Sequence, residues 1–142
     1  MCGTQWIVFK IRKKSINNKN IVIVFQQIFG DAVIFSDVVE RYLKLYKKEQ
    51  GYKVYLLVRP SVGFFLKEVI ALPEDVELRI VDFSRFVREF TYYKSIIEEY
   101  KELANTIIVP GTSLSAEIFA ASCRGNKVSG AMNTRYYNRR NF

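Results

Sequence analysis

The chain has 142 residues, of which 49% are hydrophobic and 25% are charged, and this composition is that of one globular domain rather than a disordered protein. It has no histidine, which excludes histidine triads and histidine metal clusters. Its two cysteines, Cys2 and Cys123, have no CxxC partner, so we expect free thiols and no bound metal. The net charge is +8, and no apolar run reaches the roughly 18 residues of a spanning helix.

Basic residues gather at both ends of the chain. Residues 1–20 and 124–142 each carry five basic residues and no acidic one. Such ends attract the phosphates of lipid or nucleic acid, or serve only as solubilising termini. We therefore divide the chain into a basic N-terminal lead (1–20), a folded domain (21–130) and a basic aromatic tail (131–142) that could begin a linker.

The folded domain shows alternating strand and helix patterns. Apolar β-branched runs predict buried strands, and apolar positions at helical spacing predict the helices between them. We expect strands at 21–25, 54–58, 77–81 and 106–109, and a short fifth strand at 127–129. Between the first four strands we expect a helix from Asp31 that ends at Gly51, a helix from 59–61 to about Ala71, and one long helix. The long helix has Phe86, Phe90, Tyr93, Ile97 and Tyr100 on one face, and a further helix at 115–124 precedes the last strand.

This order of elements predicts the fold class. Repeated strand–helix units favour a mostly parallel sheet of about five strands with helices on both faces, which is a Rossmann-like α/β sandwich. Ligands of such sheets bind beyond the carboxyl ends of the strands. We therefore expect functional residues in the loops 26–31, 59–61 and 110–115, and after Val81.

The loop after the first strand carries one acid. Its sequence, FQQIFGD, has neither the GxGxxG of dinucleotide-binding proteins nor the GxxxxGK[ST] of P-loop proteins. Gly30 and Asp31 instead precede the first helix. Asp31 could be the N-cap, which accepts hydrogen bonds from backbone N–H groups, or it could be a general base.

Hydroxyl groups fill the loop after the fourth strand. Residues 110–115, PGTSLS, lie at another expected helix N-terminus, where backbone N–H groups suit an anion or a sugar hydroxyl. Capping by Ser113 or Ser115 is the alternative explanation.

Tyr136 and Tyr137 stand near arginines, as in proteins that stack on nucleic-acid bases, but the chain has no other RNA-binding signature and we expect no nucleic-acid partner.

Three segments resemble the heptosyltransferase-like glycosyltransferases of family 9. NIVIVFQQIFGDA (20–32) is similar to the first strand, loop and helix start of that family, including its Gly-Asp pair. VYLLVRPSVGFFLKEV is similar to its second strand and helix, and NTIIVPGTSLSAEIFAASCRGNKVSG to its fourth strand, following helix and closing K-V-x-G. The resemblance covers about residues 20–130.

The resemblance implies the acceptor-side half of a GT-B glycosyltransferase. Asp31 would be the catalytic base of a metal-independent, inverting transfer from a nucleotide-sugar to a surface glycan or lipid such as lipopolysaccharide. The substrate-binding residues implied with it are Gln27, Gly30, Ser61, Gly111, Thr112 and Ser113. The donor would be bound by a second domain or chain, without which we expect this chain to be inactive.

Two hypotheses about function therefore follow. The first is the glycosyltransferase half-domain, placed in the cytoplasm and peripherally at the inner face of the membrane, where the basic ends would contact anionic lipid. The second is a non-catalytic Rossmann-like module that binds an anionic surface or a partner through its basic ends. Only the first requires Asp31 to be exposed.

Overall fold

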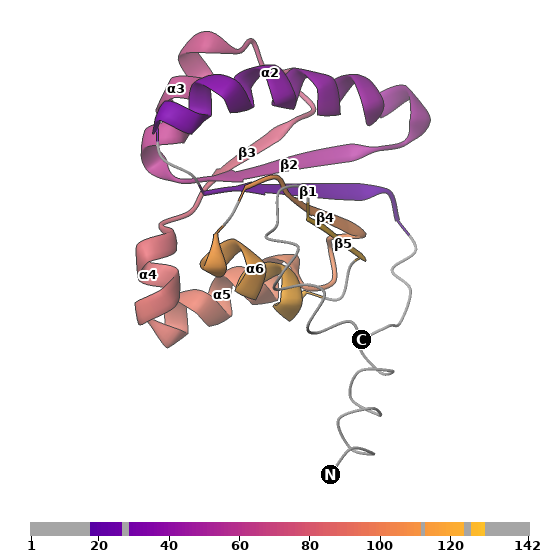
Figure 1. The fold of residues 1–142 in the computed structure, drawn as a ribbon. Coiled ribbons are helices and arrows are strands. Elements are labelled where there is room, and N and C mark those ends of the chain that lie inside the picture. The colour runs from indigo at the N-terminus through magenta and orange to yellow at the C-terminus, as the bar shows by residue number, and fades with distance from the viewer. Residues whose placement is uncertain (1–17, 27–28, 112, 124–125, 130–142) are drawn as a thin grey trace.

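The computed structural model describes residues 18–26, 29–111, 113–123 and 126–129, which fold as alternating strands and helices (Figure 1). Most of the basic lead and all of the tail at 131–142 lie outside these residues, and Asn20 belongs to the first strand. The elements are β1 (Asn20–Phe25), α2 (Phe29–Leu45), the 3-10 helix η1 (Lys48–Gln50), β2 (Lys53–Val58), α3 (Pro60–Val69), β3 (Glu77–Ile80), α4 (Phe83–Arg88), α5 (Phe90–Tyr100), β4 (Thr106–Val109), α6 (Leu114–Ser122) and β5 (Asn126–Ser129).

The strands form one parallel sheet in the order β3-β2-β1-β4-β5. The predicted Rossmann-like α/β fold is therefore confirmed. β1 lies in the centre, where Phe25 pairs with Val58 of β2 on one side and Ile23 pairs with Ile108 of β4 on the other. β2 and β3 extend the sheet on one side of β1, and β4 and β5 extend it on the other side. The switch point in strand order therefore lies between the adjacent strands β1 and β4.

Alternate residues of the central strands face two separate cores. Ile21, Ile23 and Phe25 of β1 pack against α2 and α3, whereas Val22 and Val24 pack against α4, α5 and α6. Figure 1 shows these two helical layers on opposite faces of the sheet. This is why the strands read as continuous apolar runs, since both of their faces are covered.

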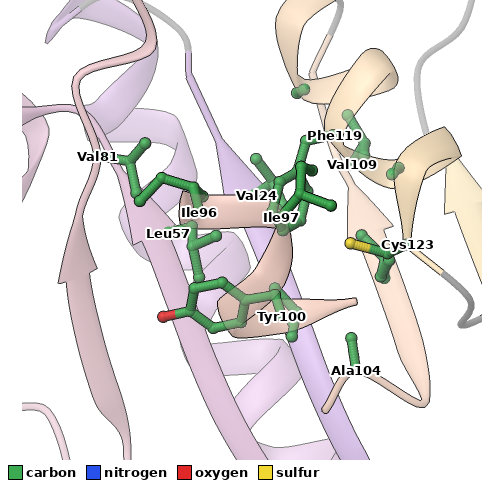
Figure 2. Packing of buried hydrophobic residues seen from close by; sticks show 14 of the residues in the cluster. Val24, Leu57, Val81, Ile96, Ile97, Tyr100, Ala104, Val109, Phe119 and Cys123 are labelled. Carbon is green, nitrogen blue, oxygen red and sulfur yellow. The ribbon is translucent and has the colours of Figure 1, made fainter. Parts of the chain in front are cut away.

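The buried titratable side chains of the core beneath α4, α5 and α6 are Tyr55, Tyr100 and Cys123, and Figure 2 shows Tyr100 and Cys123. Burial raises the pKa of the Cys123 thiol to about 12. The pKa of Tyr100 is raised as well, first by burial and then by the neighbouring Glu99 carboxylate. In the folded chain both groups therefore keep their protons at a pH where the unfolded chain has lost them.

We expect stability to fall as the pH rises above 9. The thiol ionises at about pH 8.5 in the unfolded chain, whereas in the folded chain it keeps its proton up to its raised pKa. Between these two values, each unit of rising pH lowers the free energy of unfolding by about 1.4 kcal/mol. Tyr100 adds to the loss from about pH 10. Urea denaturation at pH 8 and at pH 10 measures the loss. The Cys123→Ala variant should lose less stability than the natural chain over this interval, and an equal loss would contradict the assignment to Cys123.

The long helix predicted through Phe86 and Tyr100 is wrong, because the structure has two helices with a break at Glu89. Glu89 has φ −113° and ψ 105°, which are extended values. Asp82 caps α4 by accepting hydrogen bonds from the N–H groups of Ser84 and Arg85. The break lets α4 bury its own phenylalanines while α5 turns to bury Ile96, Ile97 and Tyr100, and it leaves Phe90 74% exposed.

The end of the first helix also differs from the prediction. α2 ends at Leu45, and Gly51 instead ends η1, with a φ of 84° and an N–H that donates to the Lys48 carbonyl. A left-handed φ is favourable only for glycine. Gly51 is therefore a turn residue, as predicted, but it belongs to the short 3-10 helix.

Asparagines occupy the amino edge of the sheet. The side-chain amides of Asn18 and Asn20 both donate to the Leu103 carbonyl, at 3.1 and 3.0 Å. The Asn105 N–H donates to the Asn20 carbonyl. These bonds join the turn after α5 to the start of β1, so we assign the polar residues of this edge a structural role.

Candidate functional site at the carboxyl edge of the sheet

The carboxyl ends of β1 and β4 lead to helices on opposite faces of the sheet. β1 continues into α2, which packs with α3, whereas β4 continues into α6, which packs with α4 and α5 (Figure 1). Helix N-termini that diverge in this way mark the position where open parallel sheets bind ligands. The candidate site is therefore the edge formed by the residues that follow β1 and β4.

Three polar side chains meet at this edge. The Gln26 Oε1 atom accepts a hydrogen bond of 2.8 Å from the Ser113 hydroxyl and a second one from the Ser115 hydroxyl. The two serine oxygens are 3.1 Å apart. Ser115 is 7% exposed. We call Gln26, Ser113 and Ser115 the edge cluster, and it joins the end of β1 to the start of α6.

Ser113 also caps α6. Its backbone is extended, and its hydroxyl accepts the Ala116 N–H at 3.5 Å. The capping role considered from the sequence is therefore confirmed for Ser113, while the same hydroxyl donates to Gln26. A single side chain thus both starts the helix and takes part in the edge cluster.

Gln26 is not among the site residues predicted from the sequence. The neighbouring Gln27 is, and it lies outside the described residues together with Thr112. A signal was available, because side chains alternate along a strand and Val24 faces α4, α5 and α6, so the residue two positions later faces the same side. This alternation places Gln26, at the end of β1, on the side of the sheet where α6 begins.

Asp31 is exposed and lies in the first turn of α2. α2 already begins at Phe29, so the first of the two alternatives for Asp31, that it is the N-cap residue, is wrong. No hydrogen bond or ion pair links its carboxylate to another described residue. Because β1 runs parallel to both of its neighbours, Asp31 follows the carboxyl end of the central strand, as the general-base hypothesis requires.

Gly30 is the second residue of α2 and lies in no tight turn. Of the described residues, only Gly51 combines a glycine with a positive φ, and a Cβ atom added at Gly30 would meet no atom within 4 Å. The backbone conformation at this position therefore does not require glycine.

We expect Gly30→Ala to stabilise the protein by about 0.5–1 kcal/mol, because alanine has the higher helix propensity and the site has room for its methyl group. Thermal denaturation of the two proteins measures this change. Gly51→Ala is the control, and it should be destabilising because alanine is strained at a φ of 84°. A loss of stability in Gly30→Ala would show that the glycine conformation is needed.

The other predicted residues lie in different surroundings. Ser61 is exposed in the first turn of α3, and no hydrogen bond links it to the edge cluster. Gly111 is half-buried in the bend between β4 and α6, close in sequence to Ser113. The structure therefore brings Ser113 together with Ser115 and Gln26, but it does not bring Ser61 to them.

The carboxylate that follows β3 has a structural role. The Ser84 hydroxyl donates to Asp82 at 2.6 Å, and this bond is the main cause that lowers the pKa of Asp82. The Asp82 N–H donates to the Tyr92 hydroxyl at 2.9 Å, which joins the end of β3 to α5. Asp82 thus starts α4 and holds the helix pair in place.

In the part of the chain that the structure describes, no group of three or more acidic or cysteine side chains is placed to hold a metal ion. None of the described helices combines the length and apolar character needed to cross a bilayer. Comparisons of the chain with protein-family models, curated proteins and solved structures found no match.

Proposed function

We propose that this chain is the acceptor-side domain of a heptosyltransferase-like glycosyltransferase, with its ligand bound at the carboxyl edge of the sheet. The observation that supports this most directly is the position of Asp31, an exposed carboxylate in the first turn of the helix that follows the central parallel strand. Gln26 of the edge cluster follows the same strand, and Ser113 and Ser115 bring two hydroxyl groups to it from the start of α6.

The proposed reaction assigns one chemical task to Asp31. Its carboxylate accepts the proton of an acceptor hydroxyl while the acceptor oxygen attacks the anomeric carbon of the donor sugar. The bond from that carbon to the nucleoside diphosphate breaks, so the sugar is transferred with inversion. A second α/β domain facing the edge would bind the nucleotide-sugar.

The edge cluster is suited to bind hydroxyl groups of an acceptor. The oxygen of the Gln26 amide already accepts two hydroxyls, whereas its NH₂ group has no hydrogen-bond partner among the described residues. That NH₂ group can donate to a ligand oxygen, and the serine oxygens keep lone pairs that can accept from a ligand hydroxyl. A donor and acceptors side by side are typical of sites that bind sugars.

Binding of acceptor glycans tests this function. Saturation-transfer NMR with fragments of bacterial surface glycans should detect a bound ligand. Its affinity should fall at least about tenfold in Gln26→Leu, because the substitution removes the amide NH₂ donor and the amide oxygen that the two serines contact. The matched control is Gln50→Leu, at an exposed glutamine of η1. Binding that is unaffected by Gln26→Leu would contradict the proposal.

The same samples test the non-catalytic alternative. Retention on anionic liposomes or RNA that disappears when residues 1–20 and 131–142 are removed, combined with no glycan binding, would favour a surface-binding module. Salt should weaken that retention, since it would depend on exposed charges.

A further inference from the structure

Arg59 is a cation at the carboxyl edge that has no acidic partner among the described residues. It directly follows β2, is half-buried, and forms no ion pair with any residue that the structure describes. Of the other described arginines, Arg41, Arg79 and Arg85 each form an ion pair with an acid, and Arg88 donates to the Ser84 carbonyl. A partly buried guanidinium without an acidic partner can accommodate an anionic ligand.

The strand register places Arg59 beside the edge cluster. Val58 of β2 pairs with Phe25 of β1, so Arg59 and Gln26 are the next residues on two adjacent parallel strands. Arg59 remains extended, with φ −72° and ψ 159°, and neighbouring strands lie about 4.8 Å apart. The two residues are therefore neighbours across the sheet edge.

Alternation puts both residues on the same face of the sheet. Phe25 and Val58 belong to the core under α2 and α3, so the residues that follow them face α4, α5 and α6. The hydrogen bonds from Ser113 and Ser115 to Gln26 agree with this orientation, because these serines begin α6.

The groups that meet there are donors and one positive charge. The Gln26 NH₂ group and the N–H groups of Leu114 and Ser115 lack a partner among the described residues, whereas the Ala116 N–H donates to the Ser113 hydroxyl. The acid nearest along the edge, Asp82, is already engaged by Ser84 and Arg85. Asp31 lies on α2, over the other face of the sheet.

We propose that Arg59 and the edge cluster bind the phosphate group of a phosphorylated ligand. This inference rests on the proposed function in that it names the chemical class of the ligand at the same edge. Arg59 would supply the charge, Gln26 an N–H donor, and the start of α6 its free backbone N–H groups. A phosphate with three acceptor oxygens matches this donor set.

Phosphate titration of the full chain tests the inference. Inorganic phosphate should bind saturably and shift the NMR signals of Gln26, Arg59 and Ser115, and Arg59→Gln should weaken the binding at least about tenfold. The control is Arg41→Gln, which removes an equal charge from an exposed arginine of α2 and should change the affinity less than twofold. Arg59→Lys should be intermediate, since it keeps the charge and loses the planar fork.

Each outcome of the titration decides the proposal. The proposal would be overturned if Arg59→Gln and Arg41→Gln weakened phosphate binding equally. It would also be overturned if the chain showed no saturable phosphate binding that Arg59→Gln weakens. Parallel titrations with a sugar phosphate, a nucleoside monophosphate and the unphosphorylated sugar identify the source of the phosphate. Phosphate binding that depends on Arg59 without any binding of acceptor glycans would support this site and contradict the glycosyltransferase function, so the two failures are distinguishable.

Discussion

Replacing Asp31 with asparagine should lower the rate of sugar transfer by about 10²–10⁴-fold, while acceptor affinity stays within a few fold. Asparagine has nearly the same size and cannot accept a proton, so the loss would report general-base catalysis alone. The side chain is exposed and has no partner among the described residues, so the substitution should leave the fold intact.

The measurement is transfer from a nucleotide-sugar to the glycan acceptor in the presence of a donor-binding domain. Asp37→Asn is a matched control, because Asp37 is an exposed aspartate of the same helix that pairs with Arg41 at 3.0 Å. Full turnover by Asp31→Asn would show that Asp31 is not the base. An equal loss in both variants would point to the charge of α2 rather than to one carboxylate.

The fold was predictable because its physical cause is local. β1, β2 and β4 are buried on both faces, and such strands require the uninterrupted apolar runs that the sequence shows. The helix between β1 and β2 shows its amphipathic spacing within the chain itself. The order of the elements then restricts the topology to a parallel sheet with crossover helices.

The errors arose where tertiary contacts decide the structure. Phe86 and Phe90 share a helical spacing, yet Phe86 is buried and Phe90 is exposed, since α4 and α5 bury different faces against the sheet. Glu89 breaks the helix, although its carboxylate pairs with Arg85 at 2.9 Å with the i,i+4 spacing typical of a continuous helix. Local periodicity cannot indicate where a helix must turn to cover a core.

The candidate site was predictable only in part for the same reason. The serine-rich loop before α6 was visible in the sequence as a helix start, and Ser113 is the cap residue. Its partner Gln26 lies 87 positions away, and the contact exists only because β1 and β4 are adjacent. A site at the switch point combines residues that are distant in sequence, so its composition follows from strand order.

Phe119→Ala should destabilise the protein by about 3–5 kcal/mol, which is a large share of the 5–15 kcal/mol typical of a domain. Phe119 is completely buried, and its ring lies 6.3 Å from that of Phe86 and 6.0 Å from that of Tyr100, which α4 and α5 contribute. Its neighbours Ala116 and Ala120 are small, so this one ring supplies most of the apolar contact that holds α6 on the sheet.

Urea denaturation measures the loss, and Ile118→Ala is the matched control. Ile118 is 37% exposed on the same helix, so its truncation should cost about 1 kcal/mol or less. Because α6 carries Ser113 and Ser115, loosening this helix should also weaken phosphate binding at Arg59 and the edge cluster. Equal losses of stability in the two variants would show that α6 is not held by Phe119, and the edge cluster would then depend on its own hydrogen bonds for its position.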